Sequence, residues 1–284
     1  MDNKKSNDRT HLPIDKAVSG DRDALSELLG EVQDTVFNLS LRMLGMVADA
    51  EDATQDILIR IMSNLASFRK DSAFTTWVYR LSVNYLIDYR KSMFAQRPLN
   101  FEFYGNDIRF AKTDDIERLV DDLTRQTLAD ELKMSCTNVM LQCLDAENRC
   151  IFILGTMFKL DSRIAGEILG MTPENYRQKL SRARKKMAGF LSEYCGLTGT
   201  GSCDCLKRVD HAVSQRRINP MKPDFLGLKV LEKDILTDCK EEMEKLDELS
   251  NTFETFPNYR SPITAQTAID KLLRSPSLQK VQQY

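Results

Sequence analysis

Residues 161–187, DSRIAGEILGMTPENYRQKLSRARKKM, carry residue types and spacings that suit contact with nucleic acid. Gly170 lies where the end of a helix needs a residue in the left-handed conformation. Thr172-Pro173 follows, a hydroxyl N-cap and then a proline at the first position of a new helix. Ser162 is predicted to cap the first of the two helices. The pattern therefore predicts two helices joined by a tight turn, a helix-turn-helix.

The second of these helices would present its N-terminal end to the major groove of duplex DNA. Ala165 is the small residue expected where the two helices cross. Polar residues near that end are candidates for contacts with base edges, and basic residues farther along for contacts with phosphates. The candidates are Glu174, Asn175, Arg177, Gln178, Lys179, Arg182, Lys185 and Lys186. The alternative is a helical hairpin with a solvated basic face, but cap, glycine, Thr-Pro and charge together favour DNA binding.

A second candidate is the aromatic and basic helix predicted over residues 74–91. Aromatic faces can stack on unpaired bases, worth about 1–3 kcal/mol per base, and basic side chains can hold the phosphate backbone. The alternative is that Trp77, Leu81 and Tyr85, spaced by four, belong to the core, which is the better interpretation of Trp77 and Leu81. The residues interpreted as exposed and polar are Arg80, Asn84 and Asp88.

Charge is distributed unevenly along the chain. The whole sequence has 40 Lys and Arg against 42 Asp and Glu, a net charge of -2. Residues 172–190 have six basic residues and one acidic residue, a net charge of +5, whereas residues 102–131 have four basic and nine acidic, a net charge of -5. The balance excludes a uniformly basic, histone-like protein, and the segregation leaves room for nucleic-acid binding.

Helical periodicity dominates the N-terminal part of the chain. Apolar residues at three- and four-residue spacing predict a helix from Asp21 to Leu44 that ends near Gly45. The acidic stretch beginning at Asp49 suits the positive N-terminal end of a second helix, which continues to Phe68.

The predicted fold class is all-α, with two small helical domains at residues 13–92 and 136–195. A flexible acidic linker, extended or partly helical, is predicted to join them over 93–135, and residues 1–12 are expected to be disordered. Residues 196–284 form a helical, cysteine-containing C-terminal extension. Its two predicted helices are an acidic amphipathic one at 230–253 and a last one capped by Ser261-Pro262 that ends near Leu273.

The cysteines of the extension raise the question of a metal. Cys195, Cys203, Cys205 and His211 are candidate ligands of a Cys₃His zinc site, but their spacing is not that of a standard finger. Seven cysteines in a chain without an apolar signal core favour reduced thiols, and no cofactor is expected.

No apolar run of about 18 residues is present, so the chain is expected to be cytoplasmic without membrane insertion. No P-loop, dinucleotide fingerprint, nucleophile elbow or HExxH motif indicates an enzyme.

Taken together, the motifs resemble the extracytoplasmic-function group of bacterial RNA polymerase sigma factors. ADAEDATQDILIRIMSNLASF (48–68) and FTTWVYRLSVNYLIDYRK (74–91) are similar to domain two of that family. DAENRCIFIL (145–154) and the segment at 161–187 are similar to domain four. The resemblance covers roughly residues 20–195, and the absence of a domain three between the two motifs fits this minimal group.

The resemblance implies a role for each group of candidates. The −35 promoter element would be read by the second helix of the helix-turn-helix, within residues 173–186. The segment that docks on the polymerase clamp helices contains Asp49, Glu51, Asp52, Gln55 and Asp56. The segment that reads and melts the −10 element contains Arg80, Asn84, Asp88, Arg90 and Lys91. For Asp49, N-terminal helix capping is an equal alternative.

The function implied is that of a non-catalytic specificity subunit whose partners are core RNA polymerase and promoter DNA. The sequence leaves open whether an anti-sigma factor is a further partner. The linker would thread toward the polymerase active-site cleft as a mimic of nucleic acid, or serve only as a solvated tether. A free-standing dimeric helix-turn-helix regulator is the alternative function, but it leaves residues 48–68 and the aromatic helix without a role.

Overall fold

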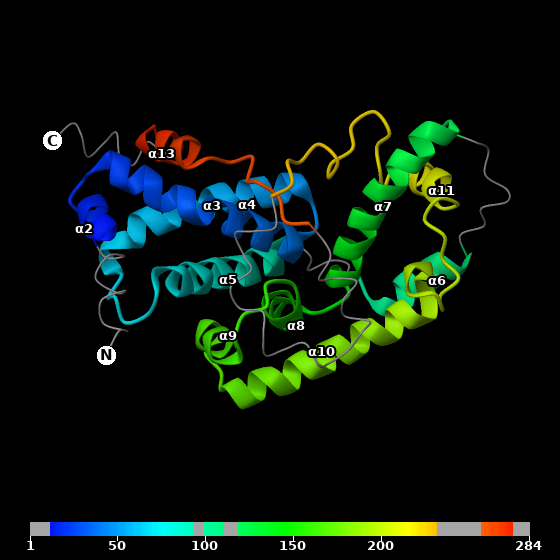
Figure 1. The fold of residues 1–284 in the computed structure, drawn as a ribbon, viewed down its shortest axis with the longest axis horizontal. Coiled ribbons are helices and arrows are strands. Elements are labelled where there is room, and N and C mark those ends of the chain that lie inside the picture. Colours follow the sequence, from blue (N-terminus) through cyan, green and yellow to red (C-terminus); the bar gives the residue numbers. More distant parts are fainter. Residues whose placement is uncertain (1–11, 94–98, 111–118, 232–256, 275–284) are drawn as a thin grey trace.

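The computed structural model describes residues 12–93, 99–110, 119–231 and 257–274 (Figure 1). Over these ranges the chain is helical and has no β-strand, with only two isolated backbone bridges. The predicted all-α fold class is confirmed. The expected disorder of residues 1–11 and most of the acidic helix expected at 230–253 lie outside the described residues.

Four helices form the N-terminal group, seen at the upper left of Figure 1. They are α2 (Leu12–Val18), α3 (Arg22–Leu44), α4 (Val47–Asn64), which is followed by the 3₁₀ turn η1 (Leu65–Ser67), and α5 (Phe74–Met93). The side chain of Asp21 caps α3 by accepting hydrogen bonds from two backbone N–H groups. Gly45 ends the helix in the left-handed conformation at φ 87°. Both ends of α3 therefore lie where local residue chemistry predicts them.

The second group follows along the chain. They are α6 (Phe101–Phe110), α7 (Asp122–Gln142), α8 (Ala146–Phe152) with the π-helical turn η2 (Ile153–Met157), α9 (Ser162–Leu169) and α10 (Pro173–Tyr194). The C-terminal extension adds the 3₁₀ turn η3 (Gly196–Thr198), α11 (Val209–Ser214) and α13 (Ala265–Leu273). Figure 1 shows α10 running along one edge of the molecule and α13 lying against the N-terminal group.

Of the linker predicted at 93–135 as extended or partly helical, the described part is largely helical. Helix α6 lies within it, and α7 crosses its boundary with the second domain without a break. The reason is aromatic packing, since the rings of Phe101 and Tyr104 lie 5.1 and 5.7 Å from the ring of Phe190 on α10. Despite its net negative charge, this segment has an apolar face, formed by Phe101 and Tyr104, that packs against α10.

One buried arginine joins the two helical groups. The Arg149 guanidinium is fully buried and donates to the backbone oxygens of Leu141, Gln142 and Leu144 at 2.7, 3.0 and 2.6 Å. It also donates to the Gln142 side chain and to the backbone oxygen of Met43 in α3, both at 2.6 Å. Residues of α3, α7 and α8 thus share a single core.

The last helix begins later than its sequence suggests. Thr264, and not Ser261-Pro262, is the N-cap of α13, and its hydroxyl accepts a hydrogen bond from the backbone N–H of Thr267 at 3.2 Å. Ser261 instead donates to the Ile263 carbonyl within the preceding turn. The predicted end of the helix at Leu273 is confirmed.

Candidate nucleic-acid and polymerase interfaces

Two helices and a tight turn lie where the cap and glycine pattern predicts them. Gly170 ends α9 in the left-handed conformation at φ 65°. The Thr172 hydroxyl caps α10 by accepting from the Asn175 N–H at 3.3 Å. The cap of α9 differs from the prediction, because Asp161 accepts from a backbone N–H where Ser162 was expected to do so.

The close approach within this turn depends on Gly166. Ala165 is fully buried, as its predicted place at the crossing requires. Gly166 has even less space around it, because a Cβ added there would lie 2.7 Å from the backbone oxygen of Met171. That contact is with backbone, which cannot move aside as the tip of a side chain can.

We expect Gly166→Ala to destabilise the chain by about 1–3 kcal/mol, because the added methyl group overpacks a rigid turn. Gly189→Ala is the matched control, since a Cβ at Gly189 meets nothing within 4 Å. Within α10 that change should stabilise by about 0.5–1 kcal/mol. Urea denaturation of both variants measures the difference, and equal midpoints would contradict this account of the turn.

Helix α10 has one buried and one exposed face. Tyr176, Leu180, Ala183 and Met187 are buried on the core side. Most of the predicted −35 residues are exposed, and these are Glu174, Asn175, Arg177, Gln178, Arg182, Lys185 and Lys186. The structure thus gathers the predicted base-contacting and phosphate-contacting residues on the solvent side of one helix.

Four basic residues of α10 have structural partners, and one of them is Arg177, which pairs with Glu174 at 3.0 Å. Lys179 pairs with Glu147 at 2.6 Å, and the Lys186 ammonium lies 5.4 Å from the centre of the Phe101 ring. Arg184 is buried and donates to the Thr156 hydroxyl at 3.0 Å. Part of the basic character of residues 172–190 therefore belongs to the packing of the domain rather than to a free surface.

On α5, the predicted −10 residues Arg80, Asn84 and Asp88 are spaced by four and lie on one side of the helix. Asn84 and Asp88 are exposed, whereas the Arg80 guanidinium pairs with Glu167 of α9 at 2.9 Å. The side chains of Arg90 and Lys91 lie outside the described residues.

The aromatic residues of α5 divide between core and surface. Trp77 packs against the hydrophobic core, with its ring 5.5 Å from Phe68 and 5.9 Å from Phe74, in line with the predicted core role. Tyr85 is half-buried and donates to the Asp56 carboxylate of α4 at 2.9 Å. Burial and that hydrogen bond raise the pKa of Tyr85.

The predicted docking residues form an acidic and amide-bearing surface at the start of α4. Asp49 lies in the first turn but is not the N-cap, which is Met46 without a side-chain cap. Partial burial and the neighbouring charge of Asp52 raise the pKa of Asp49. Gln55 and Asp56 continue this surface one turn later and are half-buried.

The cysteines gather around one apolar pocket between α7 and α10. Cys136, Cys195, Cys203 and Cys205 all line it. His211 lies elsewhere, 4.0 Å from Asp107. In the parts of the chain that the structure describes, no group of three or more His, Cys, Asp or Glu side chains is placed to hold a metal ion.

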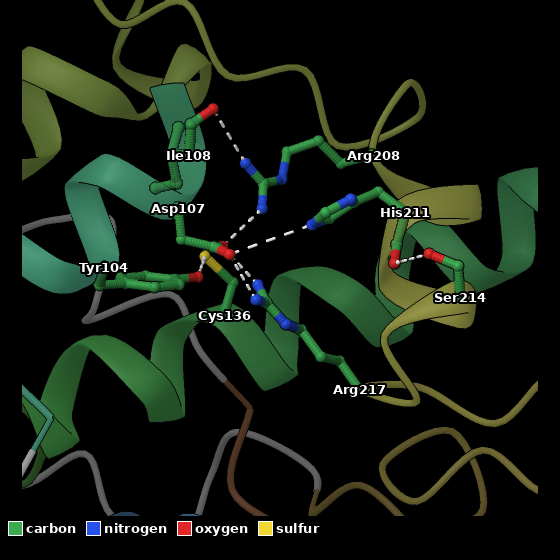
Figure 2. Close-up of polar contacts among 8 residues, drawn as sticks. All are labelled: Tyr104, Asp107, Ile108, Cys136, Arg208, His211, Ser214 and Arg217. Atoms are coloured by element: carbon green, nitrogen blue, oxygen red, sulfur yellow. Dashed lines mark hydrogen bonds and ion pairs between the residues drawn. The ribbon is translucent and has the colours of Figure 1, made fainter. Parts of the chain in front are cut away.

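Asp107 organises the contact between α6 and α11 instead (Figure 2). Its carboxylate accepts from Arg208 at 3.1 Å and from Arg217 at 2.5 Å. Burial works against ionisation of Asp107, but the hydrogen bonds from Arg217 outweigh it and lower the pKa. Burial and then the charge of Arg208 lower the pKa of His211. The predicted ligand His211 is therefore part of a cluster that holds the extension to α6.

Thiol reactivity should follow pH steeply. Burial raises the pKa of Cys203 to about 11, against about 8.5 for an unperturbed thiol. We expect native Cys203 to react with iodoacetamide at pH 7.5 roughly a hundredfold more slowly than in urea, because only the thiolate attacks. The same shift makes the folded state lose stability as pH rises above about 9 toward 11, where the unfolded chain ionises first. Peptide mass spectrometry measures the labelling, and equal rates in both states would contradict the burial.

The pairing of Glu167 with Arg80 and of Lys271 with Gln55 gave no signal in the sequence. These partners are 87 and 216 residues apart along the chain. Only a prediction of how the helical groups pack would have found them.

Comparison with known proteins finds similarity to sigma factors. The model of sigma-70 region 2 matches residues 28–93, which lie in α3, α4 and α5. The ECF RNA polymerase sigma factor SigW of Bacillus subtilis is 27% identical over 175 residues, 61% of this chain and 92% of that protein. The RNA polymerase sigma-H factor of Pseudomonas aeruginosa is 24% identical over 172 residues, 61% of this chain and 88% of that protein.

A solved structure of CnrH in complex with the cytosolic domain of CnrY has 20% sequence identity and a TM-score of 0.46, covering 64% of this chain and 96% of that one. The region 2 model and these relatives are those of sigma factors, which are transcription initiation factors and not enzymes. Over about three fifths of its length the chain is similar to ECF RNA polymerase sigma factors. None of the helices in its described part is long and apolar enough to cross a membrane.

Proposed function

We propose that this chain is a sigma factor that binds core RNA polymerase, directs it to promoters through −10 and −35 elements and promotes initiation of transcription. The observation that carries the proposal is the region 2 match over residues 28–93, which contains both the predicted docking residues and the predicted −10 residues. We propose that this role is exercised in the cytoplasm, where polymerase and chromosome meet.

Polymerase docking is proposed for the start of α4. Asp49, Asp52 and Asp56 supply negative charge there, and Gln55 supplies an amide between them. Such a surface suits a basic partner, because complementary charge steers association and fixes orientation.

Recognition of the −10 element is proposed for α5. Exposed Asn84 and Asp88 can hydrogen-bond an unpaired base, and aromatic residues of the same helix lie close to them in sequence. Arg80 can join them only after it leaves Glu167, which is an exposed pair of low energetic cost. Opening of the contact between α5 and α9 is therefore part of the proposed binding of DNA.

Recognition of the −35 element is proposed for α10. Its N-terminal turn exposes Glu174, Asn175, Arg177 and Gln178, and its middle exposes Arg182 and Lys185. A helix N-terminus with polar side chains suits base edges in the major groove, while the later basic residues suit phosphates. The corresponding domains are residues 13–92 and 136–195, with α6 and the start of α7 between them.

The test is reconstitution with core bacterial RNA polymerase and run-off transcription on a fragmented genomic library. We expect discrete transcripts that require this protein, and their upstream sequences should share two elements. Failure to bind core polymerase would reject the proposal. Tight binding of a defined duplex without polymerase at physiological salt would favour a free-standing regulator instead.

A further inference from the structure

Residues 257–274 lie along α3, and α13 within them contacts both α3 and α4 (Figure 1). Asn38 of α3 exchanges two hydrogen bonds with the backbone of Tyr259, at 2.6 and 2.8 Å. Arg42, one turn later, donates to the backbone oxygen of Pro257 at 2.7 Å. The segment is therefore held in one register by side chains of the N-terminal domain.

These side chains have the character of a built receptor. Asn38 is 3% exposed and Arg42 is 2% exposed, although both are polar. Burial lowers the pKa of Arg42 to about 10. Asp34 and Gln33 of the same helix accept from the backbone N–H groups of Ser261 and Ala265, at 2.7 and 2.9 Å. Each of these four side chains has a hydrogen-bond partner in the segment, so α3 is matched to it.

Helix α13 then covers part of α4. Ala265, Ala268 and Ile269 form its buried face. The Lys271 ammonium donates to the Gln55 side chain at 2.7 Å and lies 3.9 Å from the Asp56 carboxylate. Gln55 and Asp56 are two of the five residues to which docking on the polymerase is assigned.

We propose that α13 and core RNA polymerase compete for the same face of α4, so that the chain carries its own competitor for polymerase. The inference rests on the proposed function, because it requires α4 to be the docking surface. A basic side chain on α13 meets an amide and a carboxylate, the chemistry expected of the polymerase surface that would replace it. Polymerase binds only the fraction of molecules in which α13 has left α4, which weakens the apparent affinity in proportion.

The experiment compares full-length variants for binding to immobilised core polymerase. Ala268→Glu places a charge in the buried face of α13 and should release it from α4. Thr267→Glu is the matched control, because Thr267 is exposed and glutamate three residues after the Thr264 cap favours the helix. Lys271→Glu reverses the charge beside Asp56 at an exposed position.

We expect Ala268→Glu to bind core polymerase at least tenfold more tightly than the natural chain, and Thr267→Glu to bind as the natural chain does. Lys271→Glu should bind about threefold more tightly, because an exposed ion pair contributes little. A peptide of residues 257–274 added to Ala268→Glu should weaken its binding again. Cooperative thermal unfolding by circular dichroism establishes that each variant is folded.

A folded Ala268→Glu variant with unchanged affinity would overturn the inference while leaving the proposed function intact. If Ala268→Glu does not fold, unchanged affinity of Lys271→Glu overturns it in the same way. Absence of binding by the natural chain and by every folded variant would reject the proposed function, and the inference with it.

Discussion

Replacing Arg149 with alanine is expected to lower the free energy of unfolding by about 3–5 kcal/mol. The substitution removes five hydrogen bonds at once and leaves their acceptor oxygens inside the core. Among the residues that the structure describes, none forms a salt bridge with Arg149, so backbone and amide dipoles alone compensate its charge. Because the acceptors come from both helical groups, the loss also weakens the contact of α3 with α7 and α8.

Urea denaturation monitored by circular dichroism measures this effect. Arg163→Ala is the control, because its side chain is 85% exposed and pairs only with Asp161 at the surface. That change should cost less than about 1 kcal/mol. Arg149→Lys should recover part of the loss, because an ammonium offers three of the donors. If Arg149→Ala shifts the urea midpoint no more than Arg163→Ala does, the buried hydrogen bonds contribute little to the free energy of unfolding.

The second large effect is expected on promoter binding. The double substitution Arg182→Ala and Lys185→Ala should weaken binding of the polymerase complex to a −35 element by roughly 50-fold at 0.1 M salt. Both side chains are exposed on α10, and within the described part of the chain neither has an ion-pair partner. Each lost phosphate contact should also reduce the slope of log K against log salt by about 0.9, or about 1.8 for the pair.

Titration of promoter DNA at several salt concentrations measures both quantities. The control is Arg216→Ala with Lys222→Ala, which removes the same charge from exposed positions of the C-terminal extension. We expect that control to leave the affinity and its salt dependence unchanged. An equal loss in both double variants would mean that net charge, and not a docked face of α10, determines DNA affinity.

The sequence predicted best those features that depend on a few neighbouring residues. The ends of α3 and the turn before α10 depend on caps and on glycines at positive φ, all of which act within one turn of a helix. Ser162 and Ser261 show the limit of such signals. In each case a neighbouring residue, Asp161 or Thr264, takes the cap instead.

Predictions that depended on average composition were less specific. The acidity of residues 102–131 left open whether the segment is extended or partly helical, and α6 and α7 are helices there. Glu131 shows why, because it is 2% exposed and accepts from the backbone N–H groups of residues 224–226. Composition cannot distinguish such a buried carboxylate, whose partners lie in a distant loop, from one that is exposed to solvent.

For the candidate sites too, the sequence predicted local features but not burial. The sequence by itself determined which helices carry the polar and basic residues, because helical spacing places residues three and four apart on one side. It could not determine that Arg184 is buried in the core while Arg182 is exposed, since both belong to one basic run.

Tertiary structure alone decided the contacts between distant segments. The pairing of Arg80 with Glu167, the bond from Arg149 to the Met43 carbonyl and the approach of Lys271 to Gln55 all join different helices. Local chemistry determines where a helix begins and ends, because its caps lie within the same few residues. Burial and partnership depend on which surface packs against which, and that is a property of the whole chain.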